Sequence, residues 1–215
     1  MPTVLITREH AAPLSNLLAE RGLASVHVPM LRLVGTGAHP PAGAPSQVLV
    51  TSAAAVRFAP DLSGSILDAE VVAVGPATAA ALEARGLSVR AVGQGGGLAA
   101  LELLHSGPGV VWYLGAEQPS PGLDAALTAR GVTRWIVYRA EMQPTVVADE
   151  GLDVLVFTSG RTIEAYVEAN GRPRLPVVVL GPTTLEVAEQ HGVRVSACAE
   201  RPTLTALADA VATVV

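Results

Sequence analysis

The chain alternates between short runs of β-branched residues and amphipathic segments rich in Ala, Leu, Glu and Arg. Several of the amphipathic segments end on glycine, as in Ala84-Arg85-Gly86 and Ala129-Arg130-Gly131, which is a common way for a helix to end. Strands that alternate with helices predict parallel sheets with helices on both faces. The number of strands is too large for one small sheet and favours two. The predicted strands are 4–7, 25–29, 47–51, 70–74, 88–92, 110–114, 133–138, 153–158, 176–180 and 194–197.

The sequence also repeats short motifs directly after apolar runs. Thr51-Ser52 and Thr158-Ser159 each end such a run, and Gly75-Pro76 and Gly181-Pro182 each end the next one. Because both pairs recur in the same order at similar spacing, they predict two structurally similar halves.

A third repeat has a different position in the two halves. Residues 110–138 and 4–29 both show a strand, a helix, an Arg-Gly pair and a second strand. The first copy comes after the Thr-Ser and Gly-Pro motifs, whereas the second comes before them. This order predicts two similar parallel-sheet α/β domains, one inserted into the other, joined by a two-strand hinge with a cleft that opens and closes. The predicted limits are 1–33 with 143–215 for domain A, 38–138 for domain B, and 34–37 and 139–142 for the crossings.

Composition excludes several classes of function. The 215 residues carry a net charge of -5, and all 14 basic residues are Arg, which excludes lysine Schiff-base chemistry and a P-loop lysine. Aromatic residues make up 3%, which argues against binding nucleic acid by base stacking. A lone cysteine, Cys198, excludes an internal disulfide and a cysteine-based zinc site, and no two histidines stand at metal-ligand spacing.

We expect a cytoplasmic protein that binds neither membrane nor nucleic acid. The start of the chain lacks a basic region followed by a long apolar stretch, and no apolar stretch reaches the length that spans a bilayer.

The repeated motifs are the first candidates for binding residues, because ligands of open parallel sheets bind at the carboxyl ends of the strands. The hydroxyls of Thr51, Ser52, Thr158 and Ser159 would also make good helix N-caps, and capping alone would explain any single one of them. Their recurrence in both halves favours binding.

The Gly-Pro motifs have the same two interpretations. Proline at a first helical position is a common helix start. Glycine would also let a ligand approach helix N–H groups, which attract anions. Predicted contacts here are Gly75, Thr78, Gly181, Thr183 and Thr184.

The glycine-rich segment 93–97 resembles a dinucleotide fingerprint only weakly, because Leu98 stands where the third glycine would be. A loop that donates backbone N–H groups from Gly95 and Gly96 fits the sequence better. A nucleotide-dependent enzyme that uses this loop stays open as an alternative.

Two further candidates follow strand ends. Tyr138-Arg139 ends the last predicted strand of domain B, where a phenol could donate a proton to a leaving oxygen, although packing is the commoner role for a tyrosine. Arg8 follows the first strand and could bind a carboxylate or form a surface ion pair.

Together and in this order, seven segments resemble the uroporphyrinogen-III synthase family over nearly the whole chain. They are Val4-Leu5-Ile6-Thr7-Arg8, Val50-Thr51-Ser52, Ala73-Val74-Gly75, Val137-Tyr138-Arg139, Phe157-Thr158-Ser159, Gly181-Pro182-Thr183-Thr184 and Arg201-Pro202-Thr203. The resemblance implies two interleaved flavodoxin-like domains joined by a β-ladder. It also implies a reaction without cofactor or metal, in which hydroxymethylbilane loses water and closes with ring D inverted.

The resemblance further implies roles for individual residues. Tyr138 would assist departure of the hydroxyl, and the Thr, Ser and Gly loops would hold carboxylates of the linear tetrapyrrole. Gly160 departs from the pattern, since some members have serine there. We expect a monomer with a transient contact to the preceding pathway enzyme. A non-catalytic two-lobed small-molecule binding protein is the main alternative.

Overall fold

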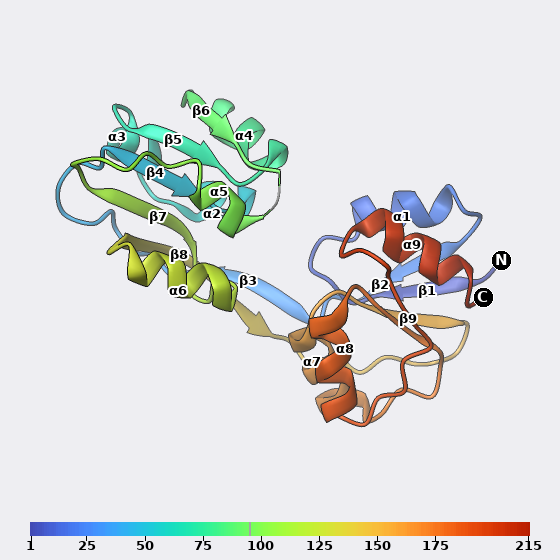
Figure 1. Cartoon of the computed structure of the whole chain (residues 1–215). Helices are drawn as coiled ribbons and strands as arrows, with labels where there is room; N and C mark the ends of the chain where they lie inside the picture. The colour runs from blue at the N-terminus through green and yellow to red at the C-terminus, as the bar shows by residue number, and fades with distance from the viewer. Residues whose placement is uncertain (95) are drawn as a thin grey trace. The chain divides into compact units, whose positions relative to one another are not determined.

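The computed structural model describes residues 1–94 and 96–215, apart from the side chain of Pro121, and the chain clusters into two compact units. Unit 1 contains Met1–Arg32 and Glu141–Val215, and unit 2 contains Leu33–Ala140. The colours of Figure 1 show that both chain ends belong to unit 1 and the middle of the chain to unit 2. The domain limits and the hinge given above stay predictions.

Unit 1 is built on a parallel sheet with the strand order β11-β10-β9-β1-β2. Numbered along the unit from its first strand, this is the order 2-1-3-4-5 of flavodoxin-like folds. The central strands β1 and β9 pair Val4 with Val154, and every residue of β9 is buried. The strands are β1 (Thr3–Ile6), β2 (Ala24–His27), β9 (Val154–Phe157), β10 (Val177–Val179) and β11 (Ala197–Cys198).

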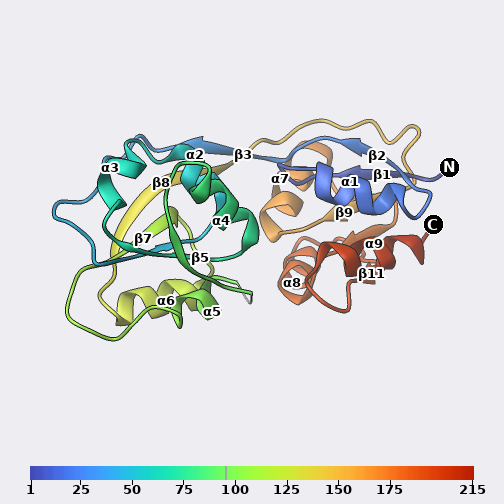
Figure 2. The same cartoon turned by 90° about the horizontal axis from the view of Figure 1, so that it is seen from above.

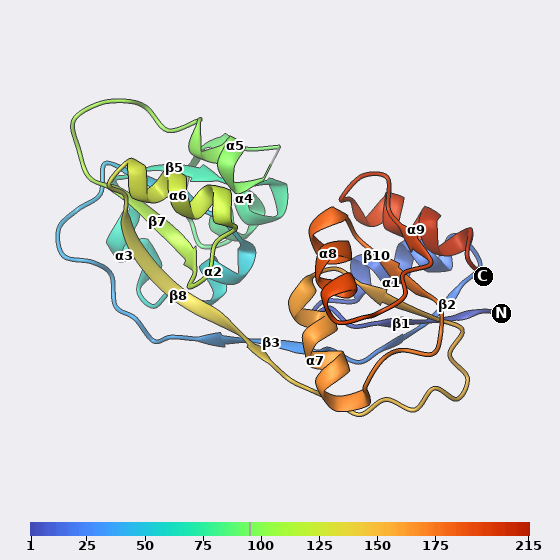
Figure 3. The same ribbon diagram turned by 60° about the horizontal axis from the view of Figure 1, so that its bottom comes forward.

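Helices cover both faces of the unit 1 sheet, because the buried strands present apolar side chains on each side. One core cluster joins the sheet to α1 (Ala12–Ala19) and α9 (Leu204–Ala212). The other joins it to α7 (Gly160–Asn170) and α8 (Pro182–Gln190), as Figure 3 shows.

Unit 2 has the sheet order β3-β8-β7-β4-β5-β6, in which β4 to β8 run parallel. The segment β8-β7-β4-β5-β6 corresponds strand for strand to β2-β1-β9-β10-β11 of unit 1, with the chain entering at a different strand. The α/β fold with two similar parallel-sheet units, expected from the repeats, is therefore confirmed. The strands are β3 (Leu31–Gly35), β4 (Gln47–Val50), β5 (Glu70–Ala73), β6 (Val89–Val92), β7 (Val111–Ala116) and β8 (Thr133–Met142).

Unit 2 also has two helical layers, which Figure 2 shows from another side. Its larger core, which includes the edge-to-face pair Trp112 and Trp135, joins the sheet to α2, α3 and α4. A smaller core joins the opposite face to α5 and α6. These helices are α2 (Ala53–Phe58), α3 (Leu62–Ile66), α4 (Pro76–Glu83), α5 (Gly97–Leu101) and α6 (Pro121–Ala129).

The structure corrects three strand predictions. β3 was not predicted, because its short Leu-Arg-Leu-Val-Gly segment lies beside a Gly- and Pro-rich stretch and only pairing next to β8 stabilises it. β8 continues past residue 138 to Met142. β11 shares only Ala197 with the predicted strand 194–197. Its limits are set by pairing with β10, which joins Val178 to Ala197 and Val179 to Cys198, and not by the local hydrophobic run.

Every helix within residues 1–94 and 96–215 is too short or too polar to cross a membrane.

Candidate functional site

Each sheet has one pair of neighbouring strands whose following connections leave in opposite directions, and ligands of open α/β sheets bind outside the carboxyl ends of such a pair. In unit 1 the pair is β1 and β9, followed by Thr7-Arg8 and Thr158-Ser159. In unit 2 it is β7 and β4, and Thr51-Ser52 follows β4. Three predicted sites therefore lie at the topological switch points of the two sheets: Arg8, Thr51-Ser52 and Thr158-Ser159.

A cavity of about 200 Å³ lies at the switch point of unit 2. Its wall contains two predicted site residues, Thr51 and Tyr138, together with Tyr113 and Gln118, which the sequence pattern does not indicate. The wall does not include the other predicted residues of unit 2 that the structure describes. They are Ser52, Gly75, Thr78, Gly96 and Arg139.

A hydrogen-bond chain holds the phenol of Tyr138. The backbone N–H of Ala55 donates to Ser52 Oγ at 3.0 Å, and Ser52 Oγ donates to Tyr138 Oη, also at 3.0 Å. The ring of Phe58 stacks beside the Tyr138 ring, with 6.0 Å between centroids and 29° between planes. Ser52 is thus an N-cap of α2, and it has a second partner besides.

A β-bulge determines which way Tyr138 points. β7 and β8 pair Gly115 with Ile136 but Ala116 with Tyr138, so one extra residue of β8 fits into the ladder at this point. Trp135 and Val137 already face the core that contains α2, and strict alternation would turn residue 138 to the opposite face. Because of the bulge, Tyr138 also packs against that core, next to Ser52.

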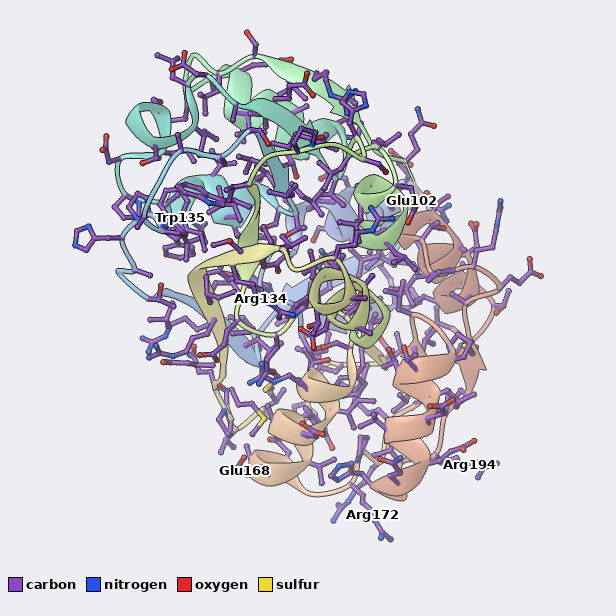
Figure 4. All side chains as sticks on the ribbon, turned by 60° about the vertical axis from the view of Figure 1, so that its left-hand side comes forward. Glu102, Arg134, Trp135, Glu168, Arg172 and Arg194 are labelled. Carbon is purple, nitrogen blue, oxygen red and sulfur yellow. The ribbon has the colours of Figure 1, made fainter. Side chains whose placement is uncertain are left out.

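Figure 4 shows the start of the same strand. Arg134 lies beside α6, where it pairs with Asp124 and donates to Thr128 Oγ1 at 2.8 Å, while the adjacent Trp135 belongs to the core on the other face. The strand therefore alternates normally before the bulge.

A second phenol, Tyr113, lies deeper in the wall with 1% of its surface exposed. Its hydroxyl donates to the carbonyl of Ala116 at 3.1 Å, and Thr51 Oγ1 donates to the carbonyl of Leu114 at 3.3 Å. Burial raises the pKa of Tyr113, and a hydrogen bond with the Thr51 side chain offsets part of this rise. At pH 7 the phenol is therefore neutral.

Gly115 lies directly under these two side chains. A Cβ atom at this position would collide with Tyr113 Oη and Thr51 Oγ1. Glycine is therefore needed for close approach rather than for an unusual backbone angle.

The glycines of segment 93–97 also have packing roles. A Cβ on Gly93 would lie 2.9 Å from Ala100 Cβ, and one on Gly97 would lie 2.6 Å from Leu123 Cδ2. Gly96 has φ of +87° and stands at the N-cap of α5. Gly95 lies outside the described residues.

The switch point of unit 1 is held by Thr7 and bears Arg8. The buried Thr7 Oγ1 donates to the carbonyl of Val156 at 2.8 Å, which ties the ends of β1 and β9 together. His27 Nε2 donates to the carbonyl of Arg8 at 2.7 Å. Burial lowers the pKa of the Arg8 guanidinium, which has no acceptor in the part of the chain that the structure describes. A half-buried cation of this kind is suited to binding a carboxylate.

Ser159 differs from its counterpart Ser52. It stands at the N-cap position of α7, but its side chain makes no capping hydrogen bond. Among the described residues, neither its hydroxyl nor that of Thr158 has a partner. Thr162 Oγ1 donates to the Ser159 carbonyl at 2.7 Å. Capping therefore explains Ser52 but not Ser159.

The two Gly-Pro motifs have matching geometry. Gly75 and Gly181 are the N-caps of α4 and α8, and each is followed by proline. Thr78 and Thr184, both 3% exposed, stand at the same position in the first turn, whereas Thr183 is exposed. Within the described residues, no group of three or more His, Cys, Asp or Glu side chains could hold a metal ion.

Comparison with known proteins agrees with this architecture. The structure of uroporphyrinogen-III synthetase from Helicobacter pylori 26695 matches with a TM-score of 0.68 and 18% identity over 99% of this chain and 98% of that chain. A mutant uroporphyrinogen III synthase from the extremely thermophilic bacterium Thermus thermophilus matches with a TM-score of 0.57 and 22% identity over 97% and 96%. These likenesses show the fold.

No curated protein matches the chain. The family model described as Uroporphyrinogen-III synthase HemD matches residues 12–209, which is most of the chain. The match confirms the resemblance seen in the sequence and does not favour the binding-protein alternative. The chain belongs to the uroporphyrinogen-III synthase family, and it is an enzyme of tetrapyrrole (haem) synthesis that acts on a small molecule.

Proposed function

We propose that this enzyme is a hydro-lyase that closes hydroxymethylbilane into uroporphyrinogen III, with loss of water and inversion of ring D. The observation that carries the proposal is the Tyr138 phenol, which lines the unit 2 cavity and accepts a hydrogen bond from Ser52. Because the phenol oxygen is an acceptor in that bond, its own O–H is available to a ligand.

The chemistry needs a proton donor and a defined geometry more than a strong nucleophile. The electrons of the pyrrole ring expel the hydroxyl, and the proton that Tyr138 donates lets it leave as water. The azafulvene that remains is attacked by the substituted carbon of ring D to give a spiro intermediate. Cleavage and re-formation of a carbon–carbon bond then invert ring D, and loss of a proton restores the aromatic pyrrole and balances the donated one.

Without an enzyme, the linear tetrapyrrole closes without inversion of ring D. The protein must therefore select one arrangement of the two ends of the tetrapyrrole. Holding reacting groups in a near-attack geometry contributes up to about 7–11 kcal/mol in favourable cases. This requirement is consistent with a site built of hydroxyls and backbone groups rather than of a nucleophile and a base.

We further propose which residues hold the substrate carboxylates. In unit 2 they are Thr51, Gly75, Thr78, Gly96 and Arg139, and in unit 1 they are Arg8, Thr158, Ser159, Gly181, Thr183 and Thr184. The support is strongest for Arg8, whose half-buried guanidinium has no acceptor among the described residues, and for the hydroxyls of Thr158 and Ser159. Such local donors must offset the net charge of -5, which repels a polyanion.

We also propose a cytoplasmic monomer that contacts the preceding pathway enzyme transiently. The support is chemical: the linear substrate closes on its own to the uninverted isomer, so rapid delivery to this enzyme preserves it. Sedimentation at several concentrations measures the oligomeric state.

A coupled assay tests the function. Hydroxymethylbilane is generated in place, and the porphyrin isomers are separated after oxidation. We expect the type III isomer with the wild-type chain, and formation of type I alone would support a binding protein instead.

Tyr138→Phe tests the residue. We expect kcat for type III formation to fall about 10²-fold, the lower end for general acid catalysis, because the pyrrole itself drives much of the C–O cleavage. Tyr166→Phe is the matched control, since Tyr166 is a phenol buried in the core of unit 1. Full type III yield from Tyr138→Phe would remove Tyr138 from the chemistry and leave the family assignment intact.

A further inference from the structure

The hydroxyl of Ser52 has two protein partners. Its single proton is used in one of these two hydrogen bonds and is therefore not available to a ligand. It accepts from the Ala55 N–H and donates to Tyr138 Oη, each at 3.0 Å. We infer that Ser52 is a positioning residue, which fixes the direction of the Tyr138 O–H, rather than a residue that binds substrate carboxylates. The inference rests on the proposed role of Tyr138.

The cap on α2 makes this arrangement directional. A backbone N–H cannot reverse its polarity, so it must donate to Ser52 Oγ and it fixes the position of that oxygen. The serine proton is directed to the phenol oxygen, which lies 3.0 Å away. A phenol that already accepts from serine donates its own proton along another direction, and such a chain of hydrogen bonds strengthens each donor.

The surroundings of the ring limit its other orientations. The Phe58 ring stacks along one side of Tyr138, and the bulge opposite Ala116 sets the ring on the α2 side of the sheet. Tyr138 lines the cavity, whereas Ser52 does not. The serine therefore reaches the cavity only through the phenol.

The corresponding position in unit 1 lacks both halves of this device. Ser159 makes no capping bond, and no phenol accepts from it among the described residues. Sequence alone gives the two Thr-Ser motifs the same role, but the structure separates them. Only the copy in unit 2 is linked to the proposed proton donor.

Four variants test the inference. Ser52→Thr keeps both the cap and the donated hydrogen bond. Ser52→Asp keeps the cap, but its carboxylate can only accept hydrogen bonds. The phenol O–H of Tyr138 would then donate to this carboxylate and would not be available to a ligand. Ser52→Ala loses both bonds. Thr203→Ala is the matched control for a lost cap, because Thr203 Oγ1 accepts from the Ala206 N–H at 3.3 Å on α9 in unit 1.

The kinetic readout is the split between kcat and KM for type III formation. We expect Ser52→Ala to lower kcat about 10-fold with KM unchanged, the size of one hydrogen bond of about 1.4 kcal/mol. Ser52→Asp should lower kcat toward the level of Tyr138→Phe, while Ser52→Thr and Thr203→Ala should keep the wild-type kcat. In the Tyr138→Phe background, Ser52→Ala should have no further effect on kcat.

A raised KM with unchanged kcat in Ser52→Ala would overturn the inference, because it would make Ser52 a substrate contact. An additive loss in the double variant would overturn it as well.

A spectroscopic readout separates this inference from the proposed function. Carbon-13 at tyrosine Cζ reports the hydrogen bonds of each phenol, and Tyr138→Phe assigns the Tyr138 resonance. We expect Ser52→Ala to shift that resonance and to leave those of Tyr113 and Tyr166 in place, whereas Thr203→Ala shifts none of them. An unmoved resonance would overturn the contact itself. A shifted resonance with full activity in both Ser52→Ala and Tyr138→Phe would instead refute the role of Tyr138.

Discussion

One added methyl group at Gly115 should disturb the whole switch point of unit 2. The Cβ of an alanine there would occupy the space of Tyr113 Oη and Thr51 Oγ1. Neither side chain can easily move away, since Tyr113 is 1% exposed and bonded to the Ala116 carbonyl, and Thr51 is bonded to that of Leu114. The backbone of β7 or β4 must shift instead.

The expected cost follows from overpacking. Extra methyl or methylene groups forced into a packed core typically cost about 1–3 kcal/mol of unfolding free energy. With a urea m-value of about 2 kcal/mol/M for a small unit, the unfolding midpoint should fall by about 0.5–1.5 M. The displaced wall should also reduce the share of type III product.

Intrinsic tryptophan fluorescence measures the unfolding of unit 2, which contains Gly115. Both tryptophans of the chain, Trp112 and Trp135, lie in the core of unit 2, so their emission follows the unfolding of that unit. Gly107→Ala is the control, since a Cβ there meets nothing within 4 Å, and its unfolding free energy should stay within about 0.5 kcal/mol of the wild type. A wild-type midpoint for Gly115→Ala would refute the reasoning that this wall is tightly packed.

Two further predictions concern packing and pH. Gly160→Ser should lower the unfolding free energy of unit 1 by about 1–3 kcal/mol, because its Cβ would lie 2.6 Å from Val187 Cγ2. In a double-mutant cycle measured by urea unfolding, Val187→Ala should restore part of this loss. Additive losses would contradict the contact. Burial raises the pKa of Tyr113, and burial followed by the charge of Asp149 raises that of Tyr166, so both phenols keep their protons in the folded state after the unfolded chain has lost them. Their stabilising contribution is complete below about pH 10 and is lost as pH rises through the folded pKa values, with a slope of at most about 1.4 kcal/mol per pH unit for each phenol. Unfolding curves between about pH 9 and 11 should be less pH-dependent for Tyr166→Phe, and an unchanged slope would show that Tyr166 ionises equally in both states.

The sequence was sufficient for the permuted architecture because that architecture repeats motifs in a changed order. It was not sufficient for β3, whose few residues form a strand only beside β8. The position of Tyr138 at a strand end was predictable, but its direction depends on a one-residue bulge that no hydrophobic pattern records.

The limits of local sequence are clearest at the two Thr-Ser motifs. Ser52 caps a helix and Ser159 does not, although both follow an apolar strand and threonine. The two serines also differ in a tertiary contact, because Ser52 donates a hydrogen bond to the phenol of Tyr138. Tyr113 was missed for a similar reason, because a buried aromatic residue within a strand gives no sign that its hydroxyl reaches a cavity.

The insertion of one unit into the other also sets an order for biosynthesis. Unit 2 is a continuous stretch of chain and can complete its core while the ribosome is still at work, whereas β1 must wait for β9, which pairs Val4 with Val154. At about 5–20 residues per second, the first strand emerges on the order of ten seconds before its partner. During that interval this largely apolar strand has only β2 to pair with, so its other edge stays uncovered, which makes the nascent N-terminal segment a natural substrate for a chaperone.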